Sequence, residues 1–346
     1  MARAVILGGT GAIGWATARR LLSEGWQVLV TGRDVSHVPP RLKALGAQFE
    51  LADRDDARAV PALLGGGADL LVDCTCYTAA HATKVIPWLG HVTSAVMISG
   101  KAVYVDDMGR HVNSEAPPHF AVPIRENQPT LRPNGADFNS REGYGPNKVA
   151  AEEVLLDSGL PVTVLRPSKV HGACARVPRE WVFLKRVIDR RPVVFLAREG
   201  RGADHPSAAL NIAALISLVA KKPGRRIMNI ADPDCPNGRS IARCVAAHFG
   251  HSWKEVLLDE NDHGALGAHP WDFWPPIVLD TTAATDLGYQ PVGTYEATIP
   301  DELDWIAPRG RTDQALNLPQ VLGSHYFQSF FDYAAEGRYL AEHGWQ

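Results

Sequence analysis

Tyr144 and Lys148 are the two residues whose types and spacing point most directly to a chemistry. They lie four residues apart, so a helix over this segment would place both side chains on one face. A free phenol has a pKa of about 10, and an ammonium group beside it stabilises the phenolate and lowers that pKa. We therefore predict that Tyr144 gives or takes the proton of a hydroxyl group and that Lys148 assists it.

A glycine-rich run near the start of the chain predicts where a cofactor binds. The run follows an apolar strand expected at residues 4–7 and precedes a helix expected at residues 14–23. In that arrangement glycines permit a tight turn and a close approach to phosphate, while the helix N-terminus attracts negative charge. The glycines are spaced three and three, whereas the common dinucleotide motif spaces them two and three. The predicted cofactor contacts in this run are Gly8, Thr10, Gly11, Ala12, Ile13 and Gly14.

The residues after the second expected strand indicate which dinucleotide binds. An NAD site usually has a carboxylate at this strand tip for the adenosine ribose 2′-hydroxyl, but here the tip is Gly32 followed by Arg33. A guanidinium suits a 2′-phosphate, so we predict NADP, with NAD as the alternative if Arg33 is solvated and Asp34 contacts the ribose. Asp53, at the end of the third expected strand, is predicted to touch the adenine ring.

Apolar strand patterns alternate with helix patterns along the first half of the chain. Strands rich in Val, Ile and Leu are expected at residues 4–7, 28–31, 48–51, 69–72, 95–99 and 162–165, with helices between most of them. Such an alternation is typical of a parallel sheet covered on both faces. The predicted fold class is α/β, a Rossmann-type doubly wound parallel sheet with a smaller mixed α/β substrate lobe.

The same pattern suggests how the chain is divided. We assign residues 1–170 to a dinucleotide-binding Rossmann domain to which residues 203–230 return, and residues 171–202 and 231–309 to the substrate lobe. Residues 310–346 form a C-terminal helical extension.

Two further segments carry structural expectations. The proline-rich stretch 106–142 is too long for an ordinary loop, so it forms either a wall of the substrate site or a surface excursion. Residues 326–340 are expected to form one helix whose aromatic stripe packs in the core or against another subunit.

Several ordered motifs resemble the extended short-chain dehydrogenase/reductase superfamily, the NAD(P)-dependent epimerase/dehydratase group, over about residues 3–306. The motifs are residues 8–14, Asp53, residues 98–104, the Tyr144 and Lys148 pair, and residues 165–172 and 287–291. The resemblance implies hydride transfer to or from nicotinamide C4, with Tyr144 exchanging the proton, Lys148 holding the nicotinamide ribose and Pro167 contacting the cofactor. Residues 73–78 are most similar to the atypical branch that includes chloroplast stem-loop-binding proteins.

The chain departs from the family pattern where the substrate would bind. Gly100 stands where the family carries a Ser or Thr that polarises the substrate oxygen. Either Ser99 is shifted into that place, or another group such as Thr75 or Lys101 replaces it, or catalysis is weak; we take Ser99 as the third catalytic candidate.

A second departure concerns the substrate itself. Many members that act on nucleotide sugars carry Asn where this chain has Lys169, and an Arg near the position of Asp204, three residues after Arg201. A carboxylate repels a diphosphate, so Lys169 and Asp204 either line a pocket for another polar substrate or pair with each other. The predicted substrate contacts are Lys101, Lys169 and Arg201.

From these residues we predict an NADP(H)-dependent oxidoreductase that interconverts a carbonyl and a secondary alcohol on a small polar metabolite. The alternatives are a nucleotide-sugar epimerase or dehydratase with tightly bound NAD(P), or a binding protein with a vestigial redox site.

The composition of the chain argues against some classes of binding partner. The chain has 346 residues and a formal net charge of −3, so it lacks the basic footprint of a nucleic-acid or anionic-membrane protein. Its five cysteines lack metal-finger spacing and suit a reducing compartment, so we expect no metal and a cytoplasmic location. A small-molecule substrate and a homodimer, paired through the helix expected at residues 144–156, complete the expectations.

Overall fold

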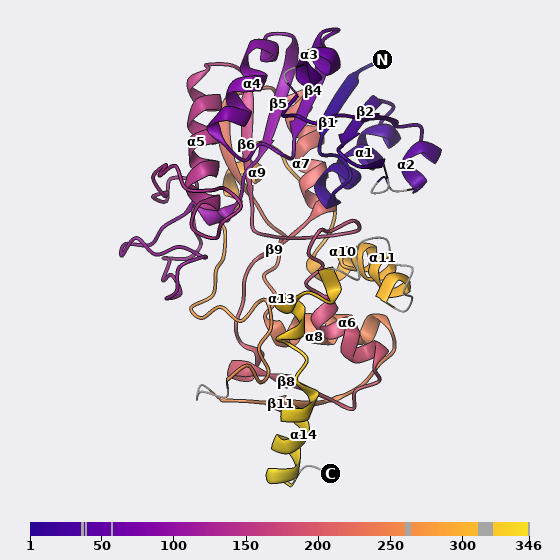
Figure 1. The fold of residues 1–346 in the computed structure, drawn as a ribbon, viewed down its shortest axis with the longest axis vertical. Coiled ribbons are helices and arrows are strands. Elements are labelled where there is room, and N and C mark those ends of the chain that lie inside the picture. Colours follow the sequence, from indigo (N-terminus) through magenta and orange to yellow (C-terminus); the bar gives the residue numbers. More distant parts are fainter. Residues whose placement is uncertain (36–37, 39, 57, 260–263, 311–320, 345–346) are drawn as a thin grey trace.

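A seven-stranded parallel sheet forms the upper half of the molecule (Figure 1). The computed structural model describes residues 1–346 except 36–37, 39, 57, 260–263, 311–320 and 345–346. The strand order is β10-β6-β5-β4-β1-β2-β3, and every neighbouring pair is parallel. The strands are β1 (Arg3–Leu7), β2 (Gln27–Gly32), β3 (Gln48–Leu51), β4 (Ala68–Asp73), β5 (Val92–Ile98), β6 (Val162–Pro167) and β10 (Arg226–Ile230).

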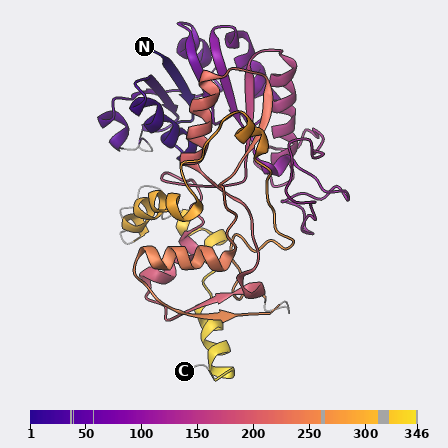
Figure 2. The same cartoon turned by 180° about the vertical axis from the view of Figure 1, so that it is seen from behind.

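Helices cover both faces of this sheet because successive strand residues alternate between two apolar layers. Ile6 of β1 packs in the layer formed with α1 (Ala12–Ser23) and α7 (Ala209–Lys221), which lie on the face seen in Figure 2. Its neighbour Val5 packs in the opposite layer. That layer is formed with α3 (Ala59–Leu64), α4 (Ala79–Leu89) and α5 (Tyr144–Asp157). The predicted doubly wound parallel sheet is confirmed.

The connections place a crevice at the carboxyl ends of the strands. The chain leaves β1 toward β2 on one side and later returns to form β4 on the other, so the connections diverge between β1 and β4. Open α/β sheets bind ligands at such a switch point. Segment 203–230 supplies α7 and the edge strand β10 to this sheet.

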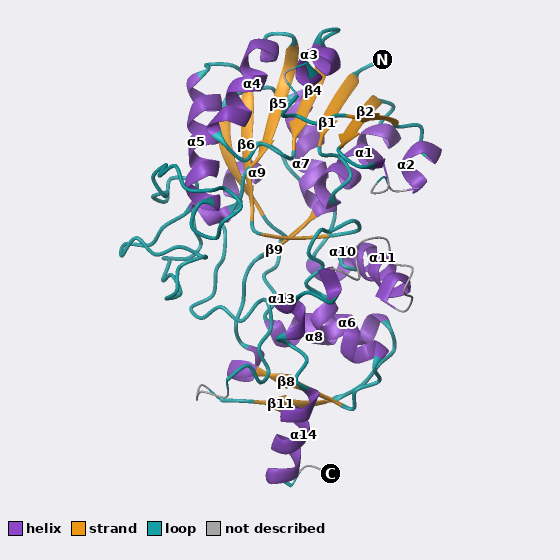
Figure 3. Ribbon diagram, in the orientation of Figure 1, coloured by secondary structure: helices purple, strands orange, loops and turns teal. Residues whose placement is uncertain are grey.

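A smaller mixed lobe lies below the sheet, linked to it largely by loops (Figure 3). It contains the parallel pair of β8 (Val193–Leu196) and β11 (Lys254–Leu257), and a core shared by α6 (Trp181–Ile188), α8 (Gly238–His248), α10 (Tyr295–Thr298) and α11 (Pro300–Gly310). A second pair of short strands, β7 (Lys169–His171) and β9 (Pro206–Ala208), lies between the two halves. The remaining short helices are α2 (Pro40–Ala44) and α9 (Thr282–Asp286).

The prediction for the C-terminal segment is wrong in one detail. The single helix expected at residues 326–340 is divided into α13 (His325–Gln328) and α14 (Tyr333–Glu342). Phe327 is fully buried in the lobe core, and Tyr339 packs edge-on against Phe195 with ring centroids 5.5 Å apart. Glu336 pairs with Arg186 at 2.7 Å. Aromatic side chains of both helices therefore pack against the core of the lobe, and the break between the helices lets each of them do so.

All five cysteines are free. No helix in the part of the chain that the structure describes is long and apolar enough to cross a membrane.

Candidate active site

The glycine-rich loop after β1 and the start of α1 together form an open backbone surface that fits a phosphate group. Gly8 has a φ of +74°, which favours glycine, and a Cβ on Gly14 would lie 2.3 Å from the Cα of Gly9, so only glycine lets α1 lie this close to the loop. A Cβ on Gly11, by contrast, would meet no atom within 4 Å. Gly11 is the N-cap of the 12-residue helix α1, which has no side-chain cap and no acidic residue in its first turn. The open side of the loop therefore presents helix N–H groups to an anion, and these residues fit a dinucleotide pyrophosphate.

The other predicted cofactor residues lie along the same edge. Thr10 packs against Gly32, where a Cβ would lie 3.0 Å from the Thr10 methyl group. Arg33 is exposed directly after the end of β2. Asp53 is also exposed, and its carboxylate accepts the N–H of Asp55 at 2.9 Å, which forms a local turn. Ala12 and Ile13 begin α1, and Pro167 ends β6.

Lys148 lies at the ends of β4 and β5, where the nicotinamide half of a dinucleotide would reach. Its ammonium group donates to the carbonyl of Cys76 at 2.7 Å and to that of Ile98 at 2.8 Å, and the side chain is buried. The same group lies 4.3 Å from the ring centroid of Tyr77 and 5.8 Å from that of Tyr144. Tyr144 and Lys148 do come together, but Tyr77 is the nearer ring.

This arrangement bears on the expected ionisation of Tyr144. Burial raises the pKa of the phenol above its ordinary value, and the guanidinium of Arg179 lowers it only in part. The Lys148 ammonium group is engaged with two carbonyls, and burial lowers its own pKa. Lys148 by itself therefore does not supply the expected lowering of the Tyr144 pKa, which stays a prediction for the protein with the positive nicotinamide ring of a bound dinucleotide nearby.

Ser99 points into a buried network and away from the predicted oxyanion role. Its hydroxyl donates to the carboxylate of Glu152 on α5, which also forms an ion pair with Arg166 on β6. All three side chains are buried. Because Glu152 holds the Ser99 hydroxyl, the geometry does not favour a catalytic role for Ser99.

Thr75, the second possible replacement for the missing Ser or Thr, is held by an ion pair that sequence reasoning missed. Arg54 donates to both oxygens of Asp73, at 2.7 and 2.9 Å, and to the Thr75 hydroxyl at 3.2 Å. Arg54 also donates to the carbonyl of His81 in the first turn of α4. Asp73 ends β4, so this buried pair fixes the loop that carries Tyr77. An Arg directly after Asp53 was the available signal.

Lys101 and Lys169 meet on one carboxylate. Both ammonium groups contact Asp204, whose side chain is fully buried, and both lie near the ring of Phe273, at 5.8 and 5.0 Å from its centroid. Burial lowers the pKa of each lysine, and Lys101 further lowers that of Lys169. Of the two possibilities for Lys169 and Asp204, the structure shows the pairing.

Arg201 lies elsewhere. It is exposed after the turn at Ala197–Gly200, with its guanidinium carbon 5.7 Å from the ring centroid of Trp274. Its predicted contact with the substrate stays a prediction, and Arg201 does not join the contacts of Lys101 and Lys169 with Asp204.

The proline-rich stretch 106–142 lies beside Tyr144. Phe138 stacks on Tyr77 with ring centroids 5.6 Å apart and an interplanar angle of 17°. The amide of Asn147 donates to the carbonyl of Ala136 at 2.7 Å. These contacts are consistent with a wall of the substrate site, which stays a prediction.

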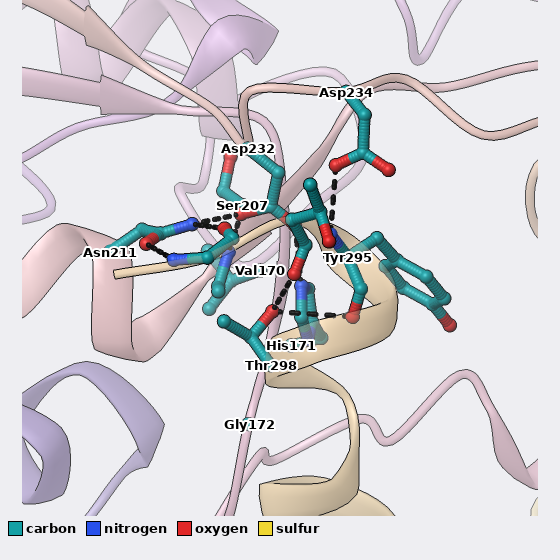
Figure 4. Close-up of polar contacts among 12 residues, drawn as sticks. Val170, His171, Gly172, Ser207, Asn211, Asp232, Asp234, Tyr295 and Thr298 are labelled. Carbon is teal, nitrogen blue, oxygen red and sulfur yellow. Dashed lines mark hydrogen bonds and ion pairs between the residues drawn. The ribbon is translucent and has the colours of Figure 1, made fainter. Parts of the chain in front are cut away.

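A buried histidine–carboxylate pair joins the two halves of the molecule (Figure 4). Nε2 of His171 lies 2.8 Å from Asp232, whose other oxygen accepts from the backbone of Ala208 and from the amide of Asn211. The His171 ring lies 5.0 Å from that of Tyr295. Burial alone would lower the pKa of His171, but the Asp232 carboxylate more than offsets this and the pKa is raised. Sequence reasoning assigned His171 only to a motif and missed this partner.

The described residues contain no group of three or more His, Cys, Asp or Glu side chains arranged to hold a metal ion. The polar side chains of the site suit proton transfer and anion binding, and a bound dinucleotide would supply the redox chemistry.

Comparison with known proteins supports the fold. No family model matches the chain. It is 24% identical over 287 residues to the chloroplast stem-loop binding protein of 41 kDa b from Arabidopsis thaliana, covering 77% of this chain and 69% of that protein.

Two solved structures match over most of their length. The UDP-glucuronic acid 4-epimerase of Bacillus cereus, in complex with UDP-glucuronic acid and NAD, matches with a TM-score of 0.64 and 15% identity, over 88% of this chain and 99% of that one. The dTDP-glucose 4,6-dehydratase of Bacillus anthracis, in complex with NAD, matches with a TM-score of 0.65 and 13% identity, over 92% and 100%. The chain therefore has the fold of these epimerase and dehydratase structures, in agreement with the resemblance inferred from the motifs.

Proposed function

We propose that this protein is a nicotinamide-dependent enzyme of the epimerase/dehydratase type, which oxidises a secondary alcohol of its substrate and reduces the product again. The observation that carries the proposal is the position of Tyr144 and Lys148 at the ends of β4 and β5, beside the phosphate cradle at Gly11. The similar structures that contain NAD support the same reading.

Each residue of the site would have its own role in binding or in proton transfer. The first N–H groups of α1 would hold the pyrophosphate, and the bound dinucleotide would supply hydride transfer at nicotinamide C4. Lys148 uses two of its three N–H groups on carbonyls, which leaves the third for a ribose hydroxyl. As a phenolate, Tyr144 would accept the hydroxyl proton when the alcohol is oxidised and return it when the carbonyl is reduced. Burial opposes this ionisation, and the positive nicotinamide ring of a bound dinucleotide would favour it.

A second candidate is a reductase that consumes NADPH and acts on a small polar metabolite. Gly32 followed by the exposed Arg33 favours it, because an arginine at this strand tip suits the 2′-phosphate of NADP. NADP as the preferred dinucleotide, a homodimer formed through α5 and a cytoplasmic location belong to the proposal as predictions.

A binding role is the third candidate, and the name of the Arabidopsis thaliana relative motivates it. A net charge of −3 opposes RNA binding, which normally depends on a basic surface. Retention on RNA at low ionic strength, lost on adding salt, would favour this candidate over both enzymes.

One experiment separates the candidates. The protein is dialysed and then denatured, and any released dinucleotide is identified by its mass and counted per chain. One NAD or NADP per chain supports the epimerase/dehydratase type, because that cofactor is regenerated in each cycle. A chain that emerges empty but binds NADPH and consumes it with a carbonyl substrate supports the reductase. A chain that binds neither dinucleotide contradicts both.

Tyr144→Phe is the matched variant for the chemistry. It removes the hydroxyl and keeps the ring, so we expect dinucleotide binding to stay within about twofold of wild type. Turnover should fall by about 10²–10⁴-fold, the usual contribution of a positioned acid or base. Unchanged turnover would contradict the role of Tyr144.

A further inference from the structure

We propose that Lys101 and Lys169 form a binding site for one anionic group of the substrate, a carboxylate or a phosphate monoester, beside Tyr144. The proposal deepens the proposed function and rests on it, because it names the class of substrate that the same site accepts.

The position of the two lysines supports this role. Lys101 follows β5 after two residues, and Lys169 begins β7 two residues after the end of β6. Strands β5 and β6 are neighbours, so both lysines lie at the carboxyl edge that also carries the Ile98 carbonyl bound by Lys148.

A third positively charged side chain, that of Arg179, lies within electrostatic range of the same groups. The guanidinium of Arg179 acts on Tyr144 and on both lysines, lowering the pKa of each. A Cβ on Gly145, next to Tyr144, would lie 2.6 Å from the carbonyl of Ala102, so the segment that carries Lys101 packs against the start of α5.

In the described part of the chain, Lys101 and Lys169 have only one carboxylate between them. Two ammonium groups share the single carboxylate of Asp204, although Lys101 is only 8% exposed and Asp204 is 0% exposed. Glu180 also acts on Lys169, but its carboxyl is hydrogen-bonded to that of Glu302. Burial disfavours the charged forms of both lysines, so a compact anion that contacts both of them would favour those charged forms and be bound by them.

The surroundings limit the size of the anion. The ring of Phe273 lies against both ammonium groups, within 5.8 Å, so the group that joins them must be compact. Arg201, predicted as a substrate contact, is exposed and lies against Trp274, and Asp204 stands near the position where many nucleotide-sugar members carry an Arg. These observations favour a small acid or sugar phosphate over a nucleotide diphosphate.

Calorimetric titration of the full chain with malonate, with inorganic phosphate and with UDP tests the proposal. For wild type we expect malonate or phosphate to bind, and the stronger of the two identifies the anion. Lys101→Met and Lys169→Met should each weaken that binding by about tenfold or more, the loss of one charge-assisted contact. Arg201→Met is the matched control on the exposed side and should bind as wild type does.

Two further variants separate an effect of charge on anion binding from an effect of packing. Lys169→Arg keeps the charge and should bind within about threefold of wild type, which separates a charge effect from loss of packing. Asp204→Asn removes the competing carboxylate and should tighten anion binding. Each variant is first checked by its melting temperature, and if one methionine variant does not fold, the other decides together with Lys169→Arg.

Either of two results would overturn the proposal: anion binding unchanged in the methionine variants, or UDP binding that depends on Arg201 and not on the lysines. NAD(P)H titration of the same samples keeps the proposed function separate. Loss of anion binding with dinucleotide binding intact concerns the lysines alone, whereas a wild-type chain that binds no dinucleotide contradicts the proposed function.

Discussion

The two sides of the sheet's carboxyl edge are built in different ways. On what we call the glycine side, Gly8, Gly11, Gly14 and Gly32 shape the backbone and leave N–H groups facing outward. On the charged side, buried ions hold one another, as in the Glu152–Arg166 pair and the contacts of Lys101 and Lys169 with Asp204. A backbone site is therefore ready for a ligand as it stands, whereas a site built from ions depends on which partners neutralise them.

The largest effect that this comparison predicts lies on the charged side, at Glu152. Glu152→Ala would leave Arg166 buried without its carboxylate and Ser99 without its acceptor. Breaking a buried pair in this way typically costs about 3–5 kcal/mol of the free energy of unfolding. Urea denaturation measures it, with the exposed neighbour Glu153→Ala as the control, which should change stability by less than about 0.5 kcal/mol. Equal stability of the two variants would show that the charged side is not held by its ions.

The next effect belongs to the glycine side and uses two glycines of one loop. Gly14→Ala would place a Cβ 2.3 Å from the Cα of Gly9, so we expect a loss of about 1–3 kcal/mol from overpacking. Gly11→Ala meets no atom within 4 Å and should be as stable as wild type. Thermal unfolding of both variants checks this contrast, and a Gly11→Ala protein destabilised as much as Gly14→Ala would contradict the open cradle.

A smaller effect is expected where the glycine side ends, at Arg33. If this exposed guanidinium pairs with the 2′-phosphate, Arg33→Ala should weaken NADPH binding by about tenfold and leave NADH binding unchanged. Calorimetry with both dinucleotides measures the two constants. Equal losses for NADPH and NADH, or a wild-type preference for NADH, would reject the NADP prediction.

The smallest expected effect is a change with pH at His171. Asp232 raises the pKa of His171 above its unfolded value of about 6.5, so the pair stabilises the fold fully below that pH. The stabilisation is lost as pH rises through the folded pKa. The stability difference between wild type and His171→Gln should therefore shrink as the pH is raised from about 6 to about 9, measured by urea denaturation. Asp232→Asn should remove the same dependence, and a difference that grows with pH would contradict the assignment.

The glycine side could be predicted from the sequence because its signals are local. Strand, glycine spacing and helix follow one another within residues 3–23, and each of them restricts the backbone directly. The charged side could not be predicted in the same way, because its partners are remote in the chain. Ser99 and Glu152 are 53 residues apart, and their contact was not foreseen. The contact of Lys169 with Asp204, 35 residues away, was foreseen only as one of two possibilities, from departures from the family pattern.

What the sequence left out follows the same division. Tyr144 and Lys148 were placed correctly on one helix, but the burial that raises the pKa of Tyr144 and the carbonyls that engage Lys148 come from tertiary packing. The short strands of β7, β8 and β9 were missed, because three or four residues carry too weak a pattern.

Calorimetric titration of the dialysed wild-type protein and of Gly11→Ala with NADPH and NADH tests the central claim most directly. We expect at least one dinucleotide to bind wild type with a stoichiometry of about one per chain, and its affinity to fall by about tenfold or more in Gly11→Ala although that variant melts as wild type does. Binding that Gly11→Ala leaves unchanged would place the dinucleotide elsewhere, and a wild-type protein that neither retains nor binds either dinucleotide would contradict the claim altogether.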